Sequence, residues 1–309
     1  MPNGTKFSEA VTEQGSPPKR NQDRAARALH LYSTLVIQPD SEPPLRDLGK
    51  YQLREVLGCG GQSVAFKAWD RDLLRHVVIK VYHNATSDIE RQRILAEGRA
   101  LARVRHSRVC TCFAVDRIGE MPYLVLQYVP GETLKDRIET GVVSDENAVR
   151  IVLDLCGAVS AIHRCGLLHC DLKPGNIMID SDNRVTVIDL GLATTQLNLT
   201  PDDIAGTPAY LAPERANGNV EEIDERCDVF GLGSILYELL TGRAPFADTT
   251  RSGSRLLSKA GVIPHVNKFH STLSSGLADV VMRSIAKFPA QRYRDVNAFV
   301  EALTSVRVD

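Results

Sequence analysis

The chain has 309 residues, of which 43% are hydrophobic and 24% charged, so it is long enough for one large domain with a sizeable core. A formal net charge of −1 argues against nucleic acid or an anionic membrane surface as a partner. Seven cysteines follow no disulfide framework, and no apolar run approaches the roughly 18–20 residues of a membrane span. We therefore expect a cytoplasmic protein.

The first 48 residues predict an extension to the main domain. Residues 1–20 are polar and contain Gly15, Pro17 and Pro18, a composition typical of disorder. A weak helical stripe covers residues 23–35, and Pro39, Pro43 and Pro44 then interrupt the chain. We interpret residues 1–48 as a partly disordered extension and residues 49–309 as the main domain.

From Tyr51 onward the pattern predicts mainly strands, which occupy residues 51–57, 64–69, 77–82, 109–115 and 123–128. A helix is expected over residues 87–104, where Ser87 and Glu90 have the spacing of a capping box. After Pro130 helices dominate, with apolar stripes over residues 145–163, 229–241, 277–286 and 296–306. A small strand-rich part followed by a larger helical part indicates an α+β fold.

A glycine cluster separates the first two predicted strands, in the sequence Leu-Gly-Cys-Gly-Gly-Gln-Ser-Val at residues 57–64. Glycines let backbone N–H groups approach phosphate oxygens, because no Cβ intervenes. The cluster is not a Walker loop, since no Lys-Ser or Lys-Thr ends it, and no helix follows as in a dinucleotide fingerprint. By itself it is consistent with phosphate binding or with an ordinary turn.

Lys80 and Glu97 form the next candidate pair. Lys80 ends the apolar run of residues 77–79, on the same strand face as Val78, and Glu97 lies within the apolar stripe of the following helix. A buried charge without a partner is costly, so pairing would satisfy both side chains and leave Lys80 directed at phosphates. An independent salt bridge, or a position at the rim of the site, is the alternative.

The segments 168–177 and 187–191 contain the residue types that phosphoryl transfer needs. Such a reaction requires an acceptor for the hydroxyl proton, ligands for a metal on the ATP phosphates, and a cation that offsets developing charge. Asp171 suits the first task, Asn176 and Asp189 the second, and Lys173 the third. These residue types also form turns, but the complete arrangement favours chemistry.

With these motifs in this order, residues 51–305 resemble the eukaryotic-type (Hanks-type) protein serine/threonine kinase family, and the loop style is similar to that of bacterial members. The resemblance implies a two-lobed protein-kinase-like fold, with an N-lobe at residues 49–126, a hinge at 127–131 and a C-lobe at 132–309. It also implies ATP as cosubstrate, together with Mg²⁺ or, instead of Mg²⁺, Mn²⁺. The implied substrates are proteins that carry serine or threonine.

The resemblance assigns individual roles as well. Lys80 and Glu97 would form the ion pair beside the phosphates, Asp171 would be the catalytic base, and Asn176 and Asp189 the Mg²⁺ ligands. Nucleotide-binding positions would be Leu57, Gly58, Gly60, Gly61, Ser63, Val64, Val78, Lys80, Leu126, Gln127 and Val129. Structural roles would fall to Glu214 paired with Arg292, and to Asp228 beneath the catalytic loop, the segment 168–177.

Three positions depart from the family's pattern. Ser63 replaces the third loop glycine, Leu190 stands where phenylalanine is usual, and Cys170 replaces the arginine before the catalytic aspartate. The first two exchanges are compatible with activity. We expect the third to affect regulation, because that arginine binds a phosphate on the activation segment in members that require one.

Two other functions fit parts of the pattern. A small-molecule phosphotransferase of the aminoglycoside or choline kinase type has a similar catalytic loop, but Lys173, the segment 189–191 and the segment 206–214 favour a protein substrate. By resemblance to the family's subgroups, Lys173 and Thr207 favour serine and threonine over tyrosine as acceptors. A pseudokinase scaffold would typically lack Lys80, Asp171 or Asp189, and all three are present.

Overall fold

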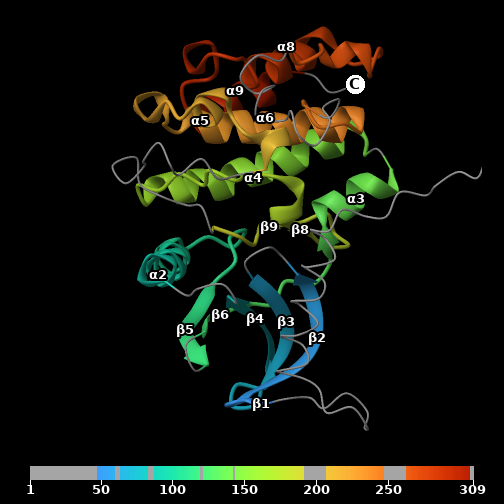
Figure 1. Ribbon diagram of the computed structural model, residues 1–309. Coiled ribbons are helices and arrows are strands. Elements are labelled where there is room, and N and C mark those ends of the chain that lie inside the picture. Colours follow the sequence, from blue (N-terminus) through green and yellow to red (C-terminus); the bar gives the residue numbers. More distant parts are fainter. Residues whose placement is uncertain are drawn as a thin grey trace, which may run out of the picture.

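The computed structural model describes residues 47–59, 63–82, 87–118, 121–141, 143–190, 207–246 and 262–306. They form two lobes: a twisted sheet with one helix beside it, and a stack of helices (Figure 1). The predicted α+β, two-lobed arrangement is confirmed. Residues 1–46 of the predicted extension lie outside the described residues, and the predicted domain boundaries stay predictions.

The N-lobe sheet has six antiparallel strands in the order β1-β2-β3-β4-β6-β5. Their bounds are Asp47–Leu48 (β1), Tyr51–Cys59 (β2), Ser63–Asp70 (β3), Arg75–Tyr82 (β4), Cys112–Ile118 (β5) and Met121–Gln127 (β6). Along β4 the side chains alternate, so that Val77, Ile79 and Val81 are buried in a core on one face of the sheet. Lys80 and Tyr82 therefore lie on the opposite face.

Helix α2 (Asp88–Arg103) covers that opposite face, beside β5 (Figure 1). Ser87 caps the helix, and both hydrogen bonds of the predicted capping box with Glu90 are present. The helix approaches the sheet closely at Gly98, where an added Cβ would lie only 2.5 Å from Cγ2 of Val115. This close packing brings the buried side of α2 within reach of β4.

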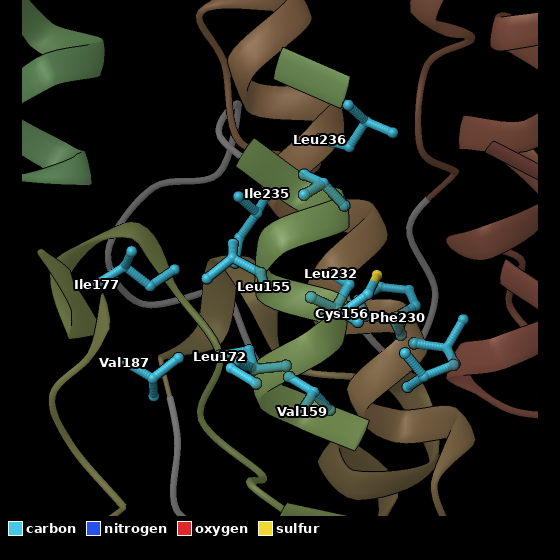
Figure 2. Close-up of a cluster of buried hydrophobic side chains, with 14 of the residues drawn as sticks. Leu155, Cys156, Val159, Leu172, Ile177, Val187, Phe230, Leu232, Ile235 and Leu236 are labelled. Atoms are coloured by element: carbon cyan, nitrogen blue, oxygen red, sulfur yellow. The ribbon is translucent and has the colours of Figure 1, made fainter. Parts of the chain in front are cut away.

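The C-lobe is built on two long helices, α4 (Asp145–Arg164) and α6 (Arg226–Thr241), which pack against each other. Figure 2 shows the centre of this core, where side chains from α4 and α6 meet those of the strands that carry the cleft residues. Around them lie α3 (Leu134–Thr140), α5 (Pro213–Asn217), α8 (Ser275–Ser284) and α9 (Val296–Ser305). Short 3-10 turns occupy Pro174–Asn176, Pro208–Tyr210, Val220–Glu222, Val266–Lys268 and Pro289–Gln291.

A second, small sheet lies between the two lobes and carries the cleft residues of the C-lobe. It consists of β7 (Glu132–Thr133), β8 (Ile177–Ile179) and β9 (Val185–Val187), in that order. Cys110 N donates to Val187 O over 2.8 Å, which connects the small sheet to the N-lobe. The catalytic-loop segment leads into β8, and Asp189 follows β9, so the sheet brings both to the cleft.

Most elements agree with the sequence pattern, with small differences at their ends. The strand expected at residues 109–115 begins only at Cys112, because Val109 and Cys110 bridge to β9 instead. The two-residue strands β1 and β7, strands β8 and β9, and helices α3 and α5 were not predicted, since such short elements carry little periodic signal. Within the described ranges, no helix combines the length and apolar character needed to cross a membrane.

Candidate active site

A cavity of about 500 Å³ opens between the two lobes. Its size suits a nucleotide-sized ligand, and its wall is mainly apolar with a few converging charges. Most of the predicted nucleotide-binding residues line it: Leu57, Gly58, Ser63, Val78, Lys80, Leu126, Gln127 and Val129. Gly60 and Gly61 lie outside the described residues.

Val64 was predicted to bind the nucleotide, and the structure places it elsewhere. Its side chain is buried in the core on the far face of the N-lobe sheet, packed with Phe66 and Ile79. Ala65 lines the cavity instead. The prediction was wrong by one residue, because a shift of one position along a strand moves a side chain to the other face.

Sequence reasoning also missed cavity residues that come from the linker after β6 and from β7. Tyr128, Glu132 and Thr133 line the cavity together with Met178 of β8. These residues carry no motif of their own, and only the tertiary arrangement places them at the ligand. The available signal was the predicted hinge at residues 127–131, which contains Tyr128 and is followed directly by Glu132 and Thr133.

Lys80 and Glu97 meet as predicted, on the face of β4 that α2 covers. Lys80 Nζ donates to Glu97 Oε1 over 2.8 Å and to Asp189 Oδ1 over 3.2 Å. Glu97 is 5% exposed and Lys80 15%. The pair thus connects helix α2, strand β4 and the segment after β9 at the inner end of the cavity.

Burial disfavours the ammonium of Lys80, but the nearby carboxylates of Asp189 and Glu97 outweigh it and hold the pKa of Lys80 well above its usual value. Lys80 therefore stays a cation at every physiological pH. For Glu97, burial raises the pKa, and the charge of Lys80 opposes that shift only in part. The glutamate thus depends on its hydrogen-bond donors to remain ionised.

The catalytic-loop residues converge on the carboxylate of Asp171. Lys173 donates from Nζ to Asp171 Oδ2 over 2.6 Å, and Asn176 Nδ2 donates to the same oxygen over 3.1 Å. Thr207 N donates to Asp171 Oδ1 over 3.0 Å, and Lys173 also reaches Thr207 Oγ1 over 2.8 Å. These contacts fix the orientation of the carboxylate beside Asn176, which lines the cavity.

The backbone before Asp171 is strained and is held in place by hydrogen bonds with two buried side chains. Cys170 has a φ of 67°, in the left-handed region that costs a residue with a Cβ about 1–2 kcal/mol. Asp228, buried at the start of α6, accepts from His169 N over 2.8 Å and from Cys170 N over 2.9 Å. Arg215 donates to Cys170 O from the other side. Asp228 thus has the place beneath the catalytic loop that the resemblance implied.

Glu214 and Arg292 also meet as expected, away from the cleft. Arg292 Nη1 and Nη2 donate to the two carboxylate oxygens of Glu214, each over 2.7 Å. Both side chains are almost completely excluded from solvent. The contact ties the segment after residue 207 to the C-terminal helices.

Asn176 and Asp189 provide oxygen atoms at the same end of the cavity. Because Asn176 Nδ2 donates to Asp171 O over 3.0 Å, its amide oxygen stays available as a ligand. In the described part of the chain no three His, Cys, Asp or Glu residues form a metal cluster. Two oxygen donors nevertheless suit Mg²⁺, which keeps several waters and shares its coordination with substrate phosphates.

Comparisons with known proteins agree with this geometry. The family model of the protein kinase domain matches residues 51–302. The chain is 36% identical over 268 residues to serine/threonine-protein kinase PknB of Mycobacterium leprae, covering 82% of this chain and 42% of that protein. It is 33% identical over 266 residues to a probable serine/threonine-protein kinase of Clostridium acetobutylicum, covering 84% and 40%.

The chain thus spans about two fifths of the length of these bacterial relatives. The matched region contains both lobes, the cavity between them and every charged residue described above. The chain therefore belongs to the protein kinase domain family.

Proposed function

We propose that the chain is an ATP-dependent protein kinase that transfers the γ-phosphate of ATP to serine and threonine hydroxyls of proteins. The observation that carries this proposal is that Lys80, Asn176 and Asp189 line one nucleotide-sized cavity, while Asn176 and Lys173 both donate hydrogen bonds to Asp171. The printed names of the relatives, which are serine/threonine-protein kinases, support the choice of hydroxyl.

ATP would bind with its base against Leu126 and the backbone of Gln127 to Val129, and with its phosphates toward Lys80. Lys80 would donate to phosphate oxygens while Glu97 holds it in place. Asn176 and Asp189 would hold Mg²⁺, or Mn²⁺ in its place, which when bound offsets the negative charge of the phosphates. Burial of this end of the cavity strengthens these electrostatic contacts.

Asp171 would accept the proton of the substrate hydroxyl while the oxygen of that hydroxyl forms a bond to the γ-phosphorus. The bond from that phosphorus to the β,γ-bridging oxygen breaks, so that ADP leaves and the phosphoryl group is transferred. Lys173, held between Asp171 and Thr207, would offset the charge that develops on the phosphoryl oxygens. Asn176 and Thr207 N would keep the Asp171 carboxylate in its reactive orientation.

The two alternative functions fit less well. The contact between Lys173 and Thr207 joins the catalytic loop to the segment on the substrate side, as a protein substrate requires. A pseudokinase scaffold has no use for Lys80, Asn176 and Asp189 at one cavity with Asp171 hydrogen-bonded to Asn176. All seven cysteines are free thiols, which supports a reducing compartment, and we propose the cytoplasm.

The test is phosphate transfer from labelled ATP to generic protein substrates, with Asp171→Asn as the key variant. We expect its rate to fall by at least about 10²-fold, the scale of a lost general base, while the fold and Mg-ATP binding persist. Asp182→Asn is the matched control, because Asp182 is exposed on a turn. A wild-type rate in Asp171→Asn would exclude the mechanism.

A further inference from the structure

Glu97 has a second partner that the kinase motifs do not account for. While Lys80 donates to Oε1, the hydroxyl of Tyr82 donates to Oε2 over 2.5 Å. The Lys80 ammonium also lies 5.3 Å from the centre of the Tyr82 ring. Tyr82 therefore contacts both members of the ion pair.

The sequence explains how one strand supplies both donors. Lys80 and Tyr82 are two residues apart on β4, so both side chains point to the face that α2 covers. Tyr82 is buried, and burial raises the pKa of its phenol above the usual value. Its hydroxyl consequently remains protonated, and a donor, throughout the physiological range.

We propose that Tyr82 is a positioning residue for phosphoryl transfer: its hydroxyl holds the free oxygen of Glu97, so that α2 stays docked and Lys80 stays beside Asp189. This inference rests on the proposed function. With both oxygens bound, the Glu97 carboxylate cannot rotate away from Lys80. Without Tyr82, Oε2 would be a buried charged acceptor with no donor, an arrangement that favours release of the glutamate.

The charged and titratable groups around Glu97 give this role a pH signature. They are Lys80 and Tyr82 of β4, Asp189 after β9, and Cys112 of β5. Burial raises the pKa of Glu97, and Lys80 and the Tyr82 hydrogen bond lower it. Removing that hydrogen bond raises the pKa further, so the ion pair is lost at a higher pH as the solution is acidified.

The decisive variant is Tyr82→Phe, which keeps the ring and its packing and removes only the hydroxyl. A hydrogen bond to a charged group changes an equilibrium roughly tenfold or more, so the acidic limb of kcat/KM for ATP is expected to move up by about one pH unit. The loss relative to wild type therefore grows on acidification. The melting temperature of each variant confirms that it is folded.

Tyr123→Phe provides a matched control on the neighbouring strand. Tyr123 is also buried in the N-lobe and also donates its hydroxyl to a carboxylate, Asp116 Oδ2, over 3.2 Å. It lies in the core on the other face of the sheet, away from the cleft. The same chemical change there should leave the pH profile of kcat/KM where it is in wild type.

A double-mutant cycle with Glu97→Gln adds a second readout. Because Tyr82 is proposed to act through Glu97, Tyr82→Phe should cost little more in the Glu97→Gln background. An additive loss, or an acidic limb that does not move in Tyr82→Phe, would overturn the proposal.

The same series is also measured by equilibrium binding of a non-hydrolysable ATP analogue with Mg²⁺ between pH 6 and 8. If the wild type binds the analogue but transfers no phosphate, the proposed function fails. The role of Tyr82 is then decided by affinity: a Kd that weakens on acidification more in Tyr82→Phe than in wild type supports it, and equal pH dependence contradicts it.

Discussion

Among the described residues, a glutamate meets a cation in a buried contact in each lobe, and the two contacts are built differently. In the C-lobe, all five N–H donors of Arg292 are used: two bind Glu214, and three bind the carbonyl oxygens of Arg226, Ala286 and Lys287. At the cleft, Lys80 uses two donors, for Glu97 and Asp189, within the part of the chain that the structure describes.

The difference separates a structural contact from one prepared for a ligand. A guanidinium with five fixed donors suits a closed site in which the protein itself satisfies every hydrogen bond. An ammonium has three rotatable donors, so Lys80 retains capacity for phosphate oxygens at the wall of the cavity. The C-lobe contact should therefore control stability, and the cleft contact activity.

The largest expected effect is on stability, for Arg292→Met. This change removes the cation and leaves the Glu214 carboxylate buried without its partner, which typically costs about 3–5 kcal/mol of the free energy of unfolding. Chemical denaturation measures the loss.

Arg294→Met is the matched control, two residues along the chain. Arg294 is 81% exposed, so its substitution should change stability by less than about 0.5 kcal/mol. Equal stability of the two variants would show that the Glu214 contact does not support the fold.

The cleft pair should show the opposite behaviour. Lys80→Met and Glu97→Ala are each expected to lower the rate of phosphate transfer by about 10²-fold, the scale of a lost charge-stabilising donor, with a smaller change in melting temperature than Arg292→Met. The double variant should be little worse than Lys80→Met, because the two side chains act as one unit. Multiplicative losses would show that they act separately.

The sequence predicted the site better than its surroundings. Lys80, Glu97, Asp171 and Asn176 could be identified because charged or amide side chains inside apolar patterns, or gathered beside turns, have few explanations. Val64 was misassigned because strand periodicity places a residue on a face only when its register is known. The cavity residues of β7 and β8 belong to elements of two and three residues, too short for any period to show.

Tyr82 illustrates the same limit. The alternation along residues 77–82 places Tyr82 on the same strand face as Lys80. A tyrosine in an apolar strand, however, is normally interpreted as a core residue. Only the structure shows that α2 brings Glu97 between the two donors. A tertiary contact of this kind has no local signature.

The smallest expected effect concerns regulation: phosphorylation of the activation segment should not be needed for activity. Residues 189–214 contain no lysine or arginine and include Asp202 and Asp203, so a phosphate there would meet local repulsion. Cys170 stands where an arginine would receive that phosphate, and its side chain is buried. Arg215 is also buried and donates to the backbone of Cys170.

The test replaces Thr194, Thr195 and Thr200, which lie outside the described residues, together by alanine and measures transfer to an external protein. Activity within a few-fold of wild type is expected. Thr207 is spared, because it accepts from Lys173, and Thr207→Ala serves as the variant that should lose activity.

A folded triple variant that loses about a hundredfold would contradict this, since a loss on that scale indicates an essential charge-stabilising contact. The cation would then have to come from helix α2, where Arg93 is exposed and Arg91 donates to Asp88 over 3.0 Å. The single variant Arg93→Ala tests whether α2 supplies this cation. It should reproduce the loss only if a phosphorylated threonine binds Arg93. Phosphothreonine in the segment does not decide the matter, because a segment beside its own active site is readily phosphorylated without consequence.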